Sequence, residues 1–185
     1  MKTFKILAIL IIVSGIIYYQ LDKRLFYYGR NDLHTYHLLP FSIEPDYQPP
    51  FEGGFALRDE NGFSIAGKGV AYRVNNRTIW INTVLKYGFN TQHFVAVVND
   101  SNKTKYYVKF NQNQKDNSVN ATMEGDNKFN NLKLDKWINI EGNEDYIWRL
   151  YLYRNYSMLL VITLFLTLVY KLVRYRKARP RAAIW

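Results

Sequence analysis

The chain has 185 residues, of which 48% are hydrophobic, so it is long enough for one modest domain with additional segments and too apolar to be wholly disordered. Its net charge of +10 is concentrated at the two ends, because residues 1–21 and 171–185 contain eight Lys and Arg and no acid. Residues 22–170 carry 17 bases and 15 acids. A nucleic-acid-binding domain carries its excess of bases on its folded body. We therefore expect no direct nucleic-acid binding by the basic C-terminal tail.

The first element is an apolar helix near the N-terminus. Residues 6–19 contain no charged side chain, and with their flanks they predict a transmembrane helix over residues 6–22 after a short cytoplasmic segment, residues 1–5. A basic start before a short apolar run is also typical of a secretory signal peptide, which needs small residues at the end of the run. Here the run ends in Ile16, Ile17, Tyr18 and Tyr19. We favour an uncleaved anchor and keep a cleaved signal as the alternative.

A second apolar run lies near the C-terminus. Residues 158–170 contain no charged side chain, and aromatic residues precede and follow them. This pattern predicts a second transmembrane helix with an aromatic belt over residues 147–173, followed by a basic cytoplasmic tail, residues 174–185. Because Lys and Arg near a membrane stay on the cytoplasmic side, both ends are expected inside and residues 23–146 outside. Lys23 and Arg24 oppose this orientation, and the six bases after Tyr170 outweigh them.

The exported segment is predicted to be mainly β, an antiparallel sheet folded as a sandwich or half-barrel. It contains no cysteine, so it must be held by its core rather than by disulfides, which indicates a bacterial inner-membrane protein with a periplasmic domain. Two hairpins are readable, one over residues 70–81 with a turn at Asn75 and Asn76, and one over residues 94–110. Weaker strands are predicted at residues 55–57, 63–66, 119–123 and 132–140. Residues 25–54 are expected to be irregular, and residues 111–120 to be a mobile loop.

Motifs for catalysis are weak. Adjacent acids at Asp59–Glu60 and Glu144–Asp145 are interpreted as solvated charges, and the sequence has no thiol, no nucleophile motif and no phosphate-binding glycine loop. His34 and His37, with Asp32 nearby, could form part of a metal site, although ordinary surface histidines explain the pattern better. We predict a non-enzymatic protein without a cofactor.

Aromatic and arginine residues flank both anchors. They suit a membrane interface, and they are also the residue types enriched at protein-binding hot spots. Membrane lipid is therefore the first expected partner and a protein at the periplasmic face the second. The candidate binding residues are Arg24, Phe26, Tyr27, Tyr28, Trp148, Arg149, Tyr151 and Tyr153.

Small and hydroxyl residues within the anchors indicate helix packing. Ala8, Ile12 and Gly15 share one face of the first helix, and Thr163 and Thr167 share one face of the second. These faces could dock the two helices within one chain or between copies in a homo-oligomer. Scattered residues in contact with lipid are the alternative.

In layout and composition the chain resembles the superinfection-exclusion proteins of phages. The resemblance rests on "ILAILIIVSGIIYY", the β-rich middle and "MLLVITLFLTLVYKLVRYRKARPR", and no diagnostic motif carries functional residues across. It implies a prophage-encoded protein that stops incoming phage DNA at the periplasmic face of the inner membrane. The alternatives are a structural subunit of an envelope secretion or transport complex, an immunity protein against a bacteriocin or toxin, and an anchored envelope enzyme.

Overall fold

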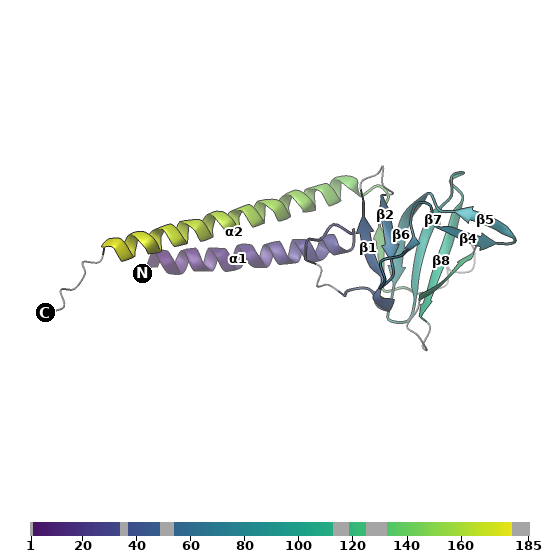
Figure 1. Ribbon diagram of the computed structural model, residues 1–185, viewed down its shortest axis with the longest axis horizontal. Helices are drawn as coiled ribbons and strands as arrows, with labels where there is room; N and C mark the ends of the chain where they lie inside the picture. Colours follow the sequence, from purple (N-terminus) through teal and green to yellow (C-terminus); the bar gives the residue numbers. More distant parts are fainter. Residues whose placement is uncertain (1, 34–36, 49–53, 113–118, 125–132, 179–185) are drawn as a thin grey trace. The chain divides into compact units, whose positions relative to one another are not determined.

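The computed structural model describes residues 2–33, 37–48, 54–112, 119–124 and 133–178 (Figure 1). The chain forms two compact units. One, the helical unit, comprises residues 1–22 and 149–185, and the other, the β domain, comprises residues 23–148. The predicted layout of terminal apolar helices around a central antiparallel β domain is confirmed.

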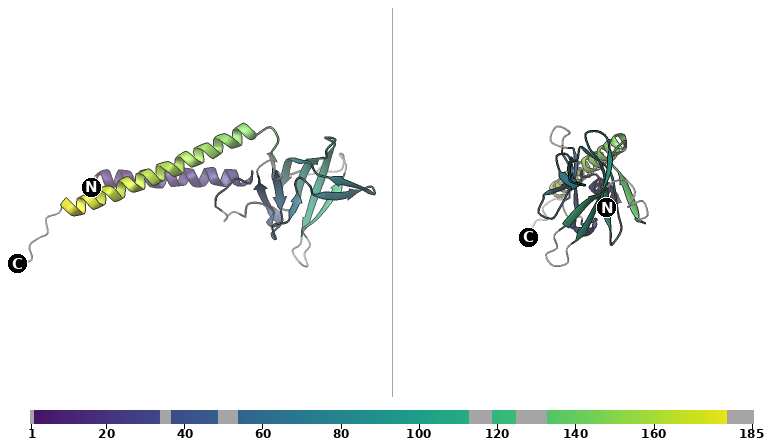
Figure 2. Two further views of the ribbon diagram at one scale, coloured as in Figure 1. Left: turned by 45° about the horizontal axis from the view of Figure 1, so that its top comes forward. Right: turned by 90° about the vertical axis from the view of Figure 1, so that its right-hand side faces the viewer.

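The helical unit consists of most of helix α1 (Lys2–Phe26) and most of helix α2 (Glu144–Ala178), which run antiparallel and side by side (Figures 1 and 2). The rings of Phe4 and Tyr175 meet edge to face, with their centroids 6.2 Å apart. Both helices are longer than their predicted spans, because polar residues continue the helices beyond the apolar runs. Acids in the first turn of α2 favour this extension, since they complement the positive end of the helix dipole.

Both helices are long and apolar enough to cross a membrane. The candidate spans are Thr3–Phe26 and Glu144–Tyr175. In each of them, only 6% of the most apolar 18-residue stretch is buried within the structure. A core helix of a soluble protein would be mostly buried. The exposed apolar surface of both helices is therefore what a lipid-facing helix requires.

The described residues of the β domain form three antiparallel sheets in the strand orders β1-β2-β3, β10-β6-β7-β8-β9 and β4-β5. In Figure 1, β6, β7 and β8 lie next to one another in the five-stranded sheet. A short 3-10 turn, Pro40–Ser42, precedes the first strand. The strands are β1 (Glu44–Tyr47), β2 (Phe55–Arg58), β3 (Ser64–Ala66), β4 (Ala71–Val74), β5 (Arg77–Trp80), β6 (Thr83–Phe89), β7 (Phe94–Asn99), β8 (Lys105–Gln112), β9 (Val119–Glu124) and β10 (Lys136–Asn139).

Both predicted hairpins are confirmed. β4 and β5 are joined by Asn75 and Asn76, whose φ values of 47° and 62° belong to the left-handed region that this two-residue turn needs. Between β7 and β8, the Asp100 carboxylate accepts hydrogen bonds from the backbone N–H groups of Asn102 at 2.9 Å and Thr104 at 2.8 Å. Side chains suited to turns therefore set the register of both hairpins.

The sequence pattern did not predict two of the strands, β6 and β1. β6 was not recognised because a bulge between Val84 and Lys86 breaks its alternation and Gly88 interrupts its apolar pattern. This glycine lies under the Trp137 ring, where an added Cβ would come within 2.7 Å of ring atoms.

The expectation that residues 25–54 are wholly irregular is wrong, because α1 continues to Phe26 and β1 forms within them. Pro45 is tolerated because β1 is an edge strand.

Three other predicted elements have different bounds. The predicted strand over residues 132–140 is shorter, since β10 covers only Lys136–Asn139. Parts of the predicted loop over residues 111–120 belong to β8 and β9, while residues 113–118 lie outside the described residues. The strand predicted at residues 63–66 begins at Ser64.

Stacked aromatic rings form the centre of the β domain. The Tyr87 ring is fully buried and stacks on Phe55 at 5.9 Å and on Phe94 at 5.4 Å between centroids. Its hydroxyl donates to the Tyr27 carbonyl at 2.7 Å, so the polar end of this core residue is satisfied. The core therefore connects β2, β6 and β7 to the last residue of α1 and the turn after it, through this hydrogen bond as well as through apolar contacts.

We expect the β domain to lose stability steeply above pH 10. Burial raises the pKa of Tyr72 to about 12, and burial, with the neighbouring Tyr27 and Tyr28, raises the pKa of Tyr87 well above 10. In the unfolded chain these tyrosines ionise near pH 10, whereas the folded domain keeps them neutral, so their stabilising contribution is full below pH 10 and is lost as the pH rises. Each should lower the free energy of unfolding by about 1.4 kcal/mol per pH unit.

Urea unfolding of the full chain between pH 8 and 12, followed by circular dichroism, would measure this slope. The Tyr72→Phe variant is the control, because it removes one of the two contributions. A free energy of unfolding that stays constant from pH 9 to 11.5 would contradict the prediction.

Candidate functional site

Gly29 places the segment after α1 directly on strand β1. Its φ of +66° is in the left-handed region, and an added Cβ would lie 2.5 Å from the backbone carbonyl carbon of Asp46. The Gly29 carbonyl accepts a hydrogen bond from the Tyr47 backbone N–H at 3.2 Å. This close backbone contact, which only glycine permits, brings β1 and its neighbours together around two pockets.

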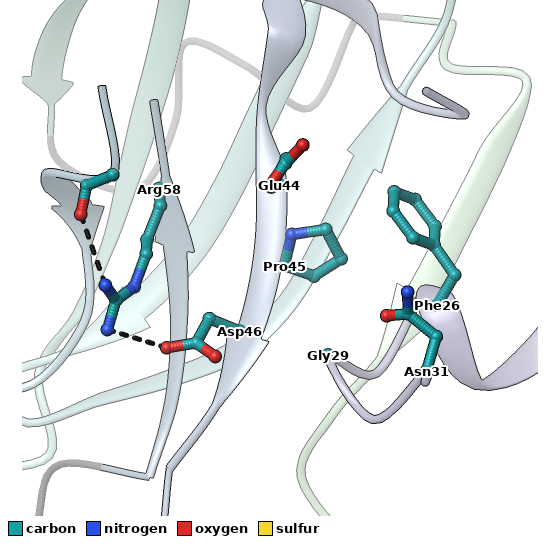
Figure 3. A pocket seen from close by; sticks show the side chains of 8 residues that line it. Phe26, Gly29, Asn31, Glu44, Pro45, Asp46 and Arg58 are labelled. Carbon is teal, nitrogen blue, oxygen red and sulfur yellow. Dashed lines mark hydrogen bonds and ion pairs between the residues drawn. The ribbon is translucent and has the colours of Figure 1, made fainter. Parts of the chain in front are cut away.

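The first, which we call the polar pocket, has a volume of about 350 Å³ (Figure 3). Arg58 reaches from β2 to the Asp46 carboxylate at 2.7 Å and donates to the Gly62 carbonyl at 3.2 Å. Figure 3 shows Phe26 and Asn31 on the opposite side of β1 from this ion pair. About a third of each charged side chain is exposed, so solvent weakens the pair. The lining residues are Phe26, Gly29, Asn31, Glu44, Pro45, Asp46, Arg58 and Gly62.

The second, which we call the aromatic pocket, has a volume of about 280 Å³. The Arg30 guanidinium stacks on the Tyr47 ring, 3.8 Å from its centroid, and the rings of Tyr28 and Tyr146 meet edge to face at 6.2 Å. Burial, and secondarily the Tyr146 hydroxyl, raises the pKa of Tyr28, which therefore stays a neutral hydrogen-bonding group. The lining residues are Tyr28, Arg30, Tyr47, Phe55, Ile140, Glu144, Asp145, Ile147 and Trp148.

The predicted binding residues after the first anchor have different surroundings. Arg24 is exposed, whereas Phe26 is buried in the core. Tyr27 packs on Phe26 and Phe89, and the Lys136 ammonium lies 3.5 Å from the centroid of its ring. Phe26 and Tyr27 thus pack the last residue of α1 and the turn after it into the β domain, and of Phe26, Tyr27 and Tyr28 only Tyr28 lines the aromatic pocket.

The predicted binding residues around the second anchor are more exposed. Trp148 and Tyr153 have exposed fractions of 54% and 58%, and Arg149 is exposed as well. Tyr151 is half-buried beneath Arg154, whose guanidinium lies 4.8 Å from its ring centroid. Of the eight predicted binding residues, the structure brings Tyr28 and Trp148 together in one pocket. The pocket also contains Arg30 and Tyr47, which the sequence pattern did not indicate as binding residues.

The predicted helix-packing residues lie beside the buried stripe of each helix. On α1 the buried positions of the helical unit are Leu7, Ser14 and Asp22, with Ala8 and Gly15 partly buried and Ile12 exposed. A Cβ added at Gly15 would meet nothing within 4 Å, so this glycine does not mark a close backbone approach.

The two threonines of α2 bond to their own helix. The Thr163 hydroxyl donates to the Leu159 carbonyl at 2.9 Å, and the Thr167 hydroxyl donates to the Thr163 carbonyl at 2.8 Å. Such bonds satisfy a hydroxyl in an apolar environment without a partner helix.

A buried ion pair connects the two helices instead. The Arg154 guanidinium donates to the Asp22 carboxylate at 3.0 Å, and the two side chains are only 2% and 0% exposed. Arg154 also donates to the Asn155 amide oxygen at 3.2 and 3.3 Å. This pair was not predicted from the sequence, although the acid after the first apolar run and the base before the second indicate that two charges could meet at the same end of antiparallel helices.

Metal ligation has little geometric basis in the described part of the chain, where no group of three or more His, Asp or Glu side chains converges. His34 lies outside the described residues, so the predicted pair with His37 has no structural account.

No family model, curated protein or solved structure matches the chain.

Proposed function

We propose that this chain is a non-enzymatic protein of the bacterial inner membrane whose periplasmic β domain binds a protein of an incoming phage and blocks DNA entry. The observation that carries the proposal is a folded β domain with an apolar, lipid-compatible helix at each end. Two anchors hold such a domain at one membrane surface and raise its local concentration against anything inserted there. The acid-free ends of the chain favour an orientation with both termini in the cytoplasm.

The β4–β5 hairpin is the surface that we assign to partner binding. Trp80 has an exposed fraction of 61%, and the strand register puts it on the same face as Ala71, Arg73 and Thr78. Residues 61–99 contain four Lys and Arg and no acid, so this surface fits an acidic protein partner. Exposed tryptophan beside arginine is the composition of a binding hot spot.

The test is to infect cells that express the chain and to score adsorption and DNA entry separately. We expect normal adsorption and reduced DNA entry, and the Trp80→Ala variant should restore entry by at least tenfold, since loss of a hot-spot tryptophan costs about 2 kcal/mol or more. The matched control is Tyr170→Ala, which removes a similarly exposed aromatic side chain from the helical unit and should leave DNA entry blocked.

Two outcomes would contradict the proposal. One is normal DNA entry for every related phage tested. The other is stable co-purification of envelope proteins from uninfected cells, which would favour a subunit of a resident complex.

A further inference from the structure

The aromatic pocket combines side chains of both charges with aromatic walls. Arg30 supplies a cation that is stacked on Tyr47, while Glu144 and Asp145 supply two carboxylates from the first turn of α2. Tyr28, Phe55 and Trp148 form ring surfaces around them. A ligand with one charge of a single sign would match only part of this lining, whereas a small zwitterion matches both.

The size of the pocket limits the ligand to a small group. Its volume of about 280 Å³ lies just below the range of about 300–1,000 Å³ that is typical of sites for drug-sized molecules. A phosphate joined through two methylene groups to a primary ammonium has suitable dimensions. Arg30 pairs with its phosphate oxygens, the carboxylates accept hydrogen bonds from the ammonium, and the rings cover the methylene groups.

The chain itself keeps this pocket near the ends of both apolar helices. Tyr28 and Arg30 follow Phe26, the last residue of α1, by two and four residues, so at most about 14 Å of chain separates them from it. Glu144 and Trp148 are the first and fifth residues of α2 and lie at the start of its candidate span, Glu144–Tyr175. When both candidate spans cross a bilayer, the ends that adjoin the pocket residues lie in the headgroup layer.

We propose that the aromatic pocket binds a phosphate–ammonium zwitterion, supplied by the headgroup of a phosphoethanolamine-type phospholipid. The inference rests on the membrane anchoring in the proposed function and is independent of phage exclusion. A bound headgroup would hold the loop after α1 and the start of α2 on one lipid, which fixes the domain against its membrane.

The test is thermal unfolding of the purified full chain in lipid-free detergent micelles, titrated with single phospholipids. Phosphatidylethanolamine should raise the unfolding temperature at a concentration about tenfold lower than phosphatidylglycerol, which has no ammonium, or phosphatidylcholine, whose ammonium cannot donate hydrogen bonds. Soluble glycerophosphoethanolamine distinguishes the source. A shift with the phospholipid alone supports a membrane ligand, and an equal shift with the soluble compound supports the same site with a free metabolite as its ligand.

Variants assign the effect to the pocket. Trp148→Ala and Glu144→Gln should each raise the half-maximal phosphatidylethanolamine concentration about tenfold. The matched controls are Trp80→Ala and Glu141→Gln, which remove a similarly exposed tryptophan and an exposed acid outside the pocket lining. They should leave that concentration unchanged.

Three results would overturn the assignment. The first is equal stabilisation by phosphatidylethanolamine and phosphatidylglycerol. The second is an equal rise in the half-maximal phosphatidylethanolamine concentration in the pocket variants and their controls. The third is no stabilisation by any phospholipid, as expected for a pocket that receives a protein side chain.

Alkaline carbonate extraction of cell membranes is the separate test of anchoring. A chain released by carbonate contradicts the proposed function, whereas a retained chain without lipid selectivity contradicts only the pocket.

Discussion

The Arg154→Ala variant is expected to lose about 3–5 kcal/mol of stability in the helical unit. The Asp22 carboxylate is fully buried beside the Arg154 guanidinium, and truncation of the arginine leaves that charge in a low-dielectric site without its counter-ion. Unfolding of the full chain in detergent micelles by added dodecyl sulfate, followed by helical circular dichroism, would measure the loss.

The double variant Asp22→Leu with Arg154→Leu distinguishes the effect of an unpaired buried charge from the effect of lost side-chain volume. Because it removes both charges and retains apolar volume, it should recover most of the stability that Arg154→Ala loses. The Arg24→Ala variant is the control for a general loss of arginine, since Arg24 is exposed on α1, and it should change stability by less than about 0.5 kcal/mol. Equal effects of Arg154→Ala and Arg24→Ala would show that the buried pair does not stabilise the helices.

The Gly29→Ala variant is expected to destabilise the β domain by about 3 kcal/mol. Roughly 1 kcal/mol comes from a positive φ in a residue with a Cβ, and about 2 kcal/mol from displacement of β1, whose backbone lies 2.5 Å from the added atom. Since the same displacement separates Arg30 from Tyr47, lipid-dependent stabilisation through the aromatic pocket should weaken as well. Urea unfolding of the full chain would measure the first effect.

Gly142→Ala is a matched control for that variant. Gly142 also has a positive φ, of +75°, but an added Cβ there would meet nothing within 4 Å. We therefore expect this control to lose only about 1 kcal/mol, the cost of the backbone conformation alone. If both alanine variants lose the same free energy of unfolding, the close contact between residue 29 and β1 does not determine the stability of the domain.

Local signals in the sequence predicted the parts of the fold that depend on neighbours in the chain. The turn at Asn75 and Asn76 and the hairpin around Asp100 are determined within a few residues, and the apolar runs with their flanks predict both helices by length and composition. β6 could not be recognised in this way, because its bulge at Val84 and Lys86 and its glycine depend on partners in β7 and β10. Its pairing is determined by tertiary contacts.

The aromatic pocket was only partly predictable for the same reason. Its walls come from the loop after α1, from β1 and β2, and from the start of α2, so no single stretch of sequence contains its pattern. The sequence did identify Tyr28 and Trp148, as members of aromatic clusters that also suit a membrane interface. The sequence did not indicate Tyr47, because Pro45, two residues before it in β1, suggested irregular structure.

The pairing of β10 with β6 determines when the β domain can fold during synthesis. Ile138 lies opposite Tyr87, and both belong to the same core as Phe26. The five-stranded sheet therefore lacks one edge until residue 139 has been made, which takes on the order of 10 s at translation rates of about 5–20 residues per second. The domain is thus expected to depend on late, long-range closure, so that mutations in β10 slow folding more than mutations in the β4–β5 hairpin do.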